Sequence, residues 1–326
     1  MSASAIPFVA PLDDPRYGEE VGVSPLVRRV IARNPSKYTY CGTGTYVVGR
    51  GEVAVIDPGP LLDTHRDALA AALAGERVVA IVVTHCHSDH SPLAAWLRDE
   101  TGAPTIAFGP HGALADDDPA EWSDWPEPAD EAPAGGEAAT EEPRESVDAS
   151  FVPDVVVADG DLVASGAGWT LSAVHTPGHT SNHLCVALAE ESTLFTGDHV
   201  MGWSTTVVSP PDGDMRAYVE SLRKVQGRSD AVLRPTHGNA VTDPAPFLAA
   251  YLAHRLERER QVLEAVRGGA GRVRPMVESL YADVVPALHR PAARSVLAHL
   301  VKLVDDGLVA VDAGGQPRLS STYRPV

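Results

Sequence analysis

The stretch Val82–His90 reads VVTHCHSDH, and it decides the fold. It closes the almost wholly apolar run Arg77–Thr84 (RVVAIVVT), which is typical of a strand buried on both faces. The residues that follow, Asp89–Thr101, have helical spacing with Asp and Ser at the start. The sequence therefore predicts a loop, between a buried strand and a helix, that carries four ionisable side chains: His85, His87, Asp89 and His90.

These four side chains suit two metal ions. Residues two apart in an extended segment project to one side, so His85 and His87 can face one ion, and the following turn directs Asp89 and His90 towards a second. Imidazole nitrogen and carboxylate oxygen are ligands that zinc accepts. Taken singly, the histidines could instead be hydrogen-bonded groups in a strand, and Asp89 could be a helix N-cap.

The surrounding sequence predicts an α/β fold with two sheets. We expect the first sheet to begin at a hairpin formed by Thr43–Gly49 and Glu52–Asp57, followed by a helix over Leu61–Ala74. A second set of short strands is expected to build the second sheet: Val155–Val157, Trp169–His175, His183–Leu188 and Thr193–Thr196. A helix at Met215–Val225 and a last strand at Ala231–Arg234 complete this part of the chain.

A length of 326 residues predicts two domains, which we place at 1–250 and 251–326. Pro244–Arg267 has the pattern of a long amphipathic helix that leads out of the first domain. Helices at Val273–Tyr281 and Ala292–Asp305, then a short strand pair ending near Leu319, follow the order of a winged helix.

Residues 116–148 are rich in Asp, Glu, Pro, Ala and Gly and contain almost no aliphatic side chains. Such a segment buries too little apolar surface to offset its ordering entropy, so we expect a mobile acidic insertion. Trp122 and Trp125 near its start are either anchors onto the domain or part of a lid, and the anchor interpretation is favoured.

Charge and composition narrow the function. A net charge of -18 repels polyanions over most of the surface, although a local basic patch could still bind nucleic acid. No apolar run is long enough to span a membrane and no secretory signal is recognisable, so we expect a cytoplasmic protein. The three cysteines, Cys41, Cys86 and Cys185, are odd in number and widely spaced, which predicts reduced thiols.

The HxHxDH pattern after a strand resembles the signature of the metallo-β-lactamase superfamily, whose fold is an αββα sandwich. Three further segments resemble its other motifs in the same order: Thr176–Thr180 (TPGHT), Phe195–His199 (FTGDH) and Pro235–Asn239 (PTHGN). The resemblance implies that His179 binds the first metal, that Asp198 bridges both metals and that His237 binds the second. Four motifs in the correct order make a strong signal.

The expected chemistry follows from this centre. Two divalent ions, zinc by preference with iron or manganese as alternatives, lower the pKa of a bridging water and make hydroxide the nucleophile. Asp89 is the candidate catalytic residue, because it can also orient the attacking water and shuttle its proton. The side chain of Cys86 should point away from its neighbours, so it is not counted as a ligand. The remaining histidines match no ligand position and are interpreted as surface or core residues: His65, His111, His175, His183, His199, His254, His289 and His299.

The order of motifs and the C-terminal pattern are similar to the lactamase-β-like protein 2 group. The TPGHT motif and the motif that carries Asp198 are also similar to those of glyoxalase II-like hydrolases, whose substrate-binding region is helical and not winged. The β-lactamases that have a His, Cys, His set in their second half carry Cys where this chain has Asp198, so a β-lactamase role loses its usual ligand. The favoured substrate is a thioester or another activated acyl compound, bound to CoA or a carrier protein. A single-stranded RNA endonuclease is the alternative, with arginines gathered in the C-terminal part. A lactonase, a winged-helix module that binds DNA or protein, and a homodimer also stay open.

Overall fold

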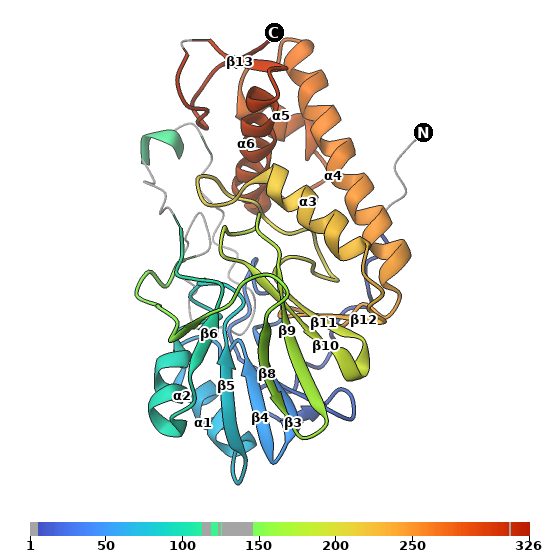
Figure 1. Ribbon diagram of the computed structural model, residues 1–326. Helices are drawn as coiled ribbons and strands as arrows, with labels where there is room; N and C mark the ends of the chain where they lie inside the picture. The colour runs from blue at the N-terminus through green and yellow to red at the C-terminus, as the bar shows by residue number, and fades with distance from the viewer. Residues whose placement is uncertain (1–5, 113–118, 123–124, 126–145, 313) are drawn as a thin grey trace.

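The computed structural model of the protein describes residues 6–112, 119–122, 125, 146–312 and 314–326. Figure 1 shows two sheets packed face to face, helices outside them, and a helical unit at the C-terminal end of the chain. None of the helices in these described ranges has the length and hydrophobicity that a membrane crossing requires.

Within the described residues, the first sheet has seven strands, in the order in which they occur in the chain. They are β1 (Val21–Gly22), β2 (Val27–Ile31), β3 (Gly44–Arg50), β4 (Glu52–Ile56), β5 (Arg77–Val82), β6 (Thr105–Ala107) and β7 (Val155–Val156). The strands from β1 to β4 pair antiparallel, and β3 and β4 form the expected hairpin. The pairs from β4 to β7 are parallel, and helices α1 (Asp63–Ala72) and α2 (Leu93–Thr101) carry the chain back from β4 to β5 and from β5 to β6.

The second sheet has five strands in the order β12-β11-β10-β9-β8. Its strands are β8 (Leu162–Gly166), β9 (Trp169–His175), β10 (Leu184–Leu188), β11 (Thr193–Gly197) and β12 (Val232–Pro235). Only β11 and β12 pair parallel, and helix α3 (Met215–Gln226) connects them.

Three apolar layers hold the two sheets and their helices together. One fills the space between the sheets and includes Tyr46, Trp169 and Phe195. A second lies between the first sheet and α2, and a third joins the second sheet to α3 and to α4 (Pro244–Arg267). The order of layers is therefore helix, sheet, sheet, helix, which confirms the predicted αββα sandwich.

The C-terminal part has the expected order of helices followed by a strand pair. Helices α5 (Val273–Leu280) and α6 (His289–Asp305) are followed by β13 (Val309–Val311), which pairs antiparallel with β14 (Tyr323–Pro325). Helix α4 runs across the boundary predicted between residues 250 and 251 and packs into both parts. That boundary stays a prediction.

Two expectations about the sheets were wrong. The first sheet begins at β1 and β2, ahead of the hairpin; the two arginines of β2 conceal its apolar pattern, and the buried Arg28 pairs with Glu20 and Glu76 at 3.4 and 3.0 Å. Strand β7 was assigned to the second sheet but pairs with β6 in the first. A strand of this length carries too little pattern to identify its partner.

Two element boundaries also differ. Helix α2 begins at Leu93 and not at Asp89, because the preceding residues form turns that direct their side chains into the site described below. The last strand is Tyr323–Pro325, beyond the end expected near Leu319. Cys41, Cys86 and Cys185 are free thiols, as predicted.

The acidic insertion expected over 116–148 falls mostly outside the described residues. Trp122 and Trp125 are described, and their exposed fractions are 7% and 8%. Both belong to an apolar cluster formed mainly by α4, α5 and α6, and the guanidinium groups of Arg290 and Arg294 lie 5.5 and 4.9 Å from the Trp122 ring centroid. The packing supports the anchor interpretation, with the anchors set in the C-terminal part of the chain.

Candidate metal centre

The seven side chains predicted as metal ligands all meet at one edge of the two sheets. His85, His87, Asp89 and His90 lie on the loop after β5, and the other three follow strands of the second sheet. His179 comes after β9, Asp198 directly after β11 and His237 after β12. Strand ends from both sheets thus bring together residues that are far apart in the chain.

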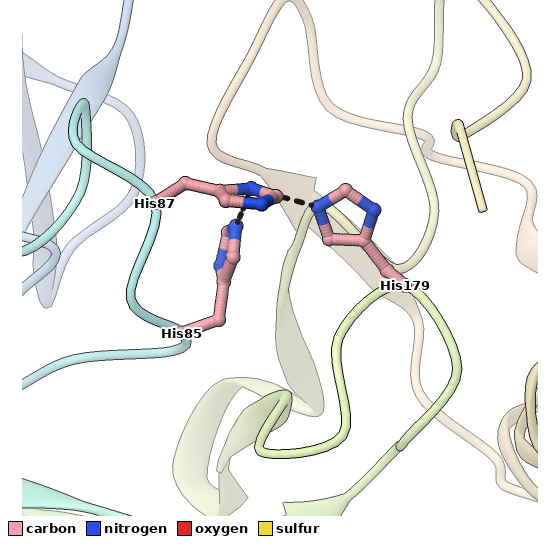
Figure 2. Close-up of side chains that lie close together, drawn as sticks. All are labelled: His85, His87 and His179. Carbon is pink, nitrogen blue, oxygen red and sulfur yellow. Dashed lines mark hydrogen bonds between the residues drawn. The ribbon is translucent and has the colours of Figure 1, made fainter. Parts of the chain in front are cut away.

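The first group of ligands, here called the His85 group, consists of His85, His87 and His179. Figure 2 shows their rings converging from two loops. His87 Nδ1 lies 2.9 Å from His85 Nε2 and 3.2 Å from His179 Nε2. One nitrogen atom of each ring lies within 4.8 Å of the other two. This spacing allows one metal ion to bind all three imidazoles.

The second group, here called the Asp89 group, consists of Asp89, His90 and His237. Asp89 Oδ2 lies 3.2 Å from both His90 Nε2 and His237 Nε2. Asp198 lies between the two groups: its carboxylate oxygens are 3.4 Å from His237 Nε2, 3.6 Å from His90 Nε2 and 4.0 Å from His179 Nε2. A carboxylate in that place can contact two ions at once.

The donor set fits two divalent cations. His90 Nε2 and Asp198 Oδ1 are buried, and neither has a hydrogen-bond partner among the described residues. Leaving buried polar atoms without partners is costly, and a bound cation would satisfy both of them. Imidazoles and carboxylates are the ligands that zinc and related ions accept. The His and Asp clusters are therefore compatible with a dimetal site.

Electrostatics divide the two groups. Burial lowers the pKa values of His85 and His87 well below the ordinary histidine value, and neighbouring histidines lower them further. Burial also opposes charge on His237, but Asp198 outweighs it and raises the pKa of His237 to about 10. For His90 burial acts in the same sense, and Asp89 and Asp198 raise its pKa well above the usual value. Without metal, the electrostatics therefore favour neutral imidazoles at His85 and His87, whereas His90 and His237 hold protons that a metal ion would displace.

Asp57 supports both groups, and the sequence analysis missed it. Its carboxylate is fully buried at the end of β4 and accepts hydrogen bonds from Thr84 N–H (2.8 Å), Thr84 Oγ1 (2.9 Å), His90 Nδ1 (2.9 Å) and Thr236 Oγ1 (2.9 Å). A proton fixed on His90 Nδ1 leaves Nε2 as the ligand atom. The signal was present, because an Asp ends the buried strand EVAVID.

Two further residues that the sequence did not reveal orient the carboxylate ligands. Thr43 Oγ1 donates to Asp89 Oδ2 at 2.8 Å. His183, which was assigned to the surface or core, is buried, and its Nε2 accepts the Asp198 N–H at 3.2 Å. Gly197, just before Asp198, has φ +49°, and a Cβ there would lie 2.6 Å from that same His183 nitrogen. The close approach of the chain to His183 just before Asp198 therefore requires glycine at position 197.

Cys86 and His111 lie close to the site without joining the two groups. The Cys86 thiol is buried and accepts a hydrogen bond from Asn182 Nδ2 at 3.0 Å, and burial raises its pKa to about 11. The expectation that Cys86 is not a metal ligand stays a prediction. The His111 ring lies 6.4 Å from the His87 ring, and its Nε2 lies 3.7 Å from the Asp212 carboxylate.

Comparison with known proteins agrees with this geometry. A curated relative, the atrochrysone carboxyl ACP thioesterase of Aspergillus chevalieri, is 32% identical over 306 residues, which span 90% of this chain and 85% of the relative. The lactamase-like protein notP of Aspergillus sp. (strain MF297-2) is 29% identical, over 90% of this chain and 85% of its own.

Solved structures show the same fold. A β-lactamase domain protein from Burkholderia ambifaria matches with a TM-score of 0.73 and 21% identity, over 97% of this chain and 96% of that one. A metallo-β-lactamase family protein from Thermus thermophilus matches with a TM-score of 0.68 and 23% identity, over 94% of this chain and 100% of that one.

Two family profiles match the sequence itself. The profile described as the metallo-beta-lactamase superfamily covers residues 39–237, which include all seven converging side chains. The profile described as the beta-lactamase associated winged helix domain covers residues 273–316. The chain therefore belongs to the metallo-β-lactamase superfamily and carries a C-terminal β-lactamase-associated winged helix domain.

Proposed function

We propose that this hydrolase cleaves an acyl thioester, carried by an acyl carrier protein or by CoA, at a dinuclear zinc centre. The ligands proposed for the two ions are the His85 group, the Asp89 group and Asp198 between them. The observation that carries the proposal is the position of the Asp198 carboxylate, within 4.0 Å of nitrogen atoms from both groups. The thioesterase named among the relatives supports this substrate class.

Two divalent ions bound there would supply Lewis acidity and lower the pKa of a bound water towards neutrality. Of the seven side chains, Asp89 is the most exposed, at 20%, whereas His90 and His237 are buried. Its Oδ2 accepts a hydrogen bond from Thr43 Oγ1 at 2.8 Å and lies 3.2 Å from Nε2 of both histidines, which fixes the direction of the carboxylate. Asp89 can thus orient a water molecule and accept its proton.

Thioester chemistry suits this set of groups. The water oxygen bonds to the acyl carbon, the carbon–sulfur bond breaks, and the products are a carboxylate and a thiol. Thiols have pKa values of about 8.5, so a thiolate leaves with less help from a proton donor than an alkoxide does. Asp89 acting as a base is therefore sufficient.

The C-terminal domain gives little support to the RNA alternative. In DNA-binding helix-turn-helix domains the second helix enters the groove. Here every residue from Pro291 to Leu300 of α6 is buried. Arginines that suggested nucleic-acid binding also have partners in the protein: Arg274 pairs with Glu278 at 2.8 Å, and Arg260 pairs with Glu257 at 2.6 Å. A cytoplasmic location and a homodimer stay predictions.

A substrate panel tests the proposal. The zinc-loaded full chain is assayed against acyl-CoA, acyl-carrier protein, a lactone, a chromogenic β-lactam and single-stranded RNA, with thiol release followed by a chromogenic disulfide. We expect thiol release that stops on chelation and is lost in Asp89→Asn. The matched control is Asp159→Asn, which alters an exposed carboxylate paired with Lys224 and should keep activity. Turnover of RNA or the lactone with inert thioesters would overturn the proposed substrate class.

A further inference from the structure

The imidazole of His179 is oriented by a carbonyl that belongs to neither sheet. His179 Nδ1 donates to Val207 O at 2.7 Å, so Nε2 is left to face His87. Val207 lies in the segment 198–214, which connects β11 to α3 without helix or strand. The backbone ladder therefore does not fix this carbonyl, and other contacts must do so.

Helix α4 supplies those contacts at the preceding residue, Thr206. The Thr206 N–H donates to Tyr251 Oη at 2.6 Å, and Arg255 Nη2 donates to Thr206 O. Tyr251 and Arg255 lie four residues apart, on one face of the helix. The Thr206 carbonyl shares a peptide plane with the Val207 N–H, so holding Thr206 at both ends fixes the chain where it enters Val207, one residue before the plane that carries the Val207 carbonyl. Thr206 Oγ1 also donates to Asp198 O at 2.7 Å.

A buried arginine is energetically unfavourable at position 255. Its exposed fraction is 3%, and it forms no ion pair with any carboxylate in the described ranges. Instead its guanidinium lies 5.1 Å from the ring centroid of Tyr218 and 5.7 Å from that of Tyr251. Burying a cation without a carboxylate is unfavourable, and an apolar side chain would fill the space more cheaply. What the guanidinium adds is the hydrogen bond to Thr206 O.

The same aromatic groups hold a second point of the segment. Tyr218 Oη donates to the carbonyl oxygen of His199, the residue that follows Asp198, at 2.7 Å. The same hydroxyl lies 3.4 Å from Tyr251 Oη. Ala298 of α6 is buried in the same apolar cluster, so the winged helix domain packs behind both tyrosines. The segment that joins Asp198 to the His179 carbonyl is thus supported from the C-terminal side of the molecule.

We propose that Tyr251 and Arg255 are positioning residues for the metal ligand His179, acting through the backbone of Thr206 and Val207. The inference rests on the proposed function, since it assumes that the His85 group binds a metal ion. It gives helix α4, which also packs into the winged helix domain, a direct part in shaping the metal centre.

The test compares three variants of the full chain. Tyr251→Phe removes one hydroxyl, and Arg255→Lys keeps the charge but loses the fork of the guanidinium. Arg258→Lys is the control, because Arg258 lies on the same helix, donates to Leu280 O at 2.8 Å and stacks 4.1 Å from the Tyr281 ring, facing the winged helix domain. Zinc dissociation constants are measured by chelator competition, and ligand geometry by the visible spectrum of the cobalt-substituted protein.

We expect Tyr251→Phe and Arg255→Lys each to lower the affinity for one of the two zinc ions about tenfold and to shift the cobalt spectrum. Tenfold is the lower end of the loss in metal affinity that is typical when a residue supporting a ligand is changed. The control should stay within about threefold of the unaltered chain. Urea unfolding of the metal-free proteins separates a loss of folding from a loss of positioning.

Unchanged zinc affinity and an unchanged cobalt spectrum in both variants would overturn the inference and leave the thioesterase proposal intact. An unaltered chain that binds no metal would overturn both. Because Tyr251→Phe is nearly isosteric, the test remains decisive even if Arg255→Lys does not fold.

Discussion

Asp57→Asn should lower the affinity of the Asp89 group for its metal ion while the protein keeps its fold. The substitution keeps the volume of a fully buried side chain but removes its charge. In Asp57, Oδ1 accepts one hydrogen bond and Oδ2 accepts three, including that from His90 Nδ1. An amide nitrogen in place of either oxygen cannot accept them, so at least one buried donor loses its partner.

The magnitude follows from these contacts. A hydrogen bond to a charged group contributes about 1.5–3 kcal/mol, so the free energy of unfolding of the metal-free protein should fall by about 2 kcal/mol. His90 also loses the acceptor that keeps its proton on Nδ1, and such losses weaken metal binding by about 10- to 100-fold. That range corresponds to about 1.4–2.8 kcal/mol of binding free energy.

Chelator competition on the full chain measures the two zinc affinities, and urea unfolding measures the stability. The matched control is Asp154→Asn, since Asp154 likewise accepts hydrogen bonds from a threonine, at 2.9 Å from the Thr105 N–H and 2.8 Å from Oγ1, but lies outside the site. The control should bind zinc as the unaltered chain does. If Asp57→Asn retained both zinc affinities within about threefold, the supporting role assigned to Asp57 would be refuted.

Three further results are expected. In the metal-free chain the pKa of His237 is about 10 and that of His90 is well above the usual value, so zinc must displace their protons. The zinc affinity of the Asp89 group should therefore rise by up to about tenfold per pH unit for each displaced proton. Chelator-competition titrations that show no such rise would contradict this. Burial lowers the pKa of His65 to about 4, below the unfolded value of about 6.5, so the stability that neutral His65 contributes is complete above pH 6.5 and is lost as the pH falls towards 4. In urea unfolding, the difference in unfolding free energy between the unaltered chain and His65→Gln should therefore shrink by about 3 kcal/mol over this range, and a constant difference would count against it. Cys86→Ala should keep the full zinc content, measured by elemental analysis, because the thiol points away from the site; loss of a zinc ion would show that it is a ligand.

The seven candidate ligands could be predicted from the sequence, because they lie in compact motifs whose order resembles that of the superfamily. His85, His87, Asp89 and His90 occur within six residues, and His179, Asp198 and His237 each follow a recognisable strand. Spacing and order carry this information without knowledge of the packing. The αββα layers were implied by the resemblance to the superfamily, whereas the strand and helix patterns themselves predicted an α/β fold with two sheets.

The supporting residues could not be found in this way. Asp57 is one Asp at a strand end, and its partners Thr84, His90 and Thr236 lie 27, 33 and 179 positions away. Only the packing of the two sheets brings these groups together. The assignment of β7 failed for a related reason, because a strand of two residues acquires its partner from tertiary structure.

Helix α2 starts at Leu93, although the local sequence favours a helix N-cap at Asp89, because the Asp89 side chain is part of the candidate metal site. Asp89 has the composition of an N-cap, yet its carboxylate accepts from Thr43 and lies beside two histidines. Trp122 and Trp125 show the converse, since a tryptophan in an acidic, aliphatic-poor segment signals burial without revealing which surface receives it.

Anomalous diffraction at the zinc absorption edge, from crystals of the zinc-loaded protein, tests the central claim most directly. The account predicts two peaks: one among His85, His87 and His179, one among Asp89, His90 and His237, with Asp198 in contact with both. Crystals that take up no zinc at these side chains, or that bind it only elsewhere on the molecule, would contradict it.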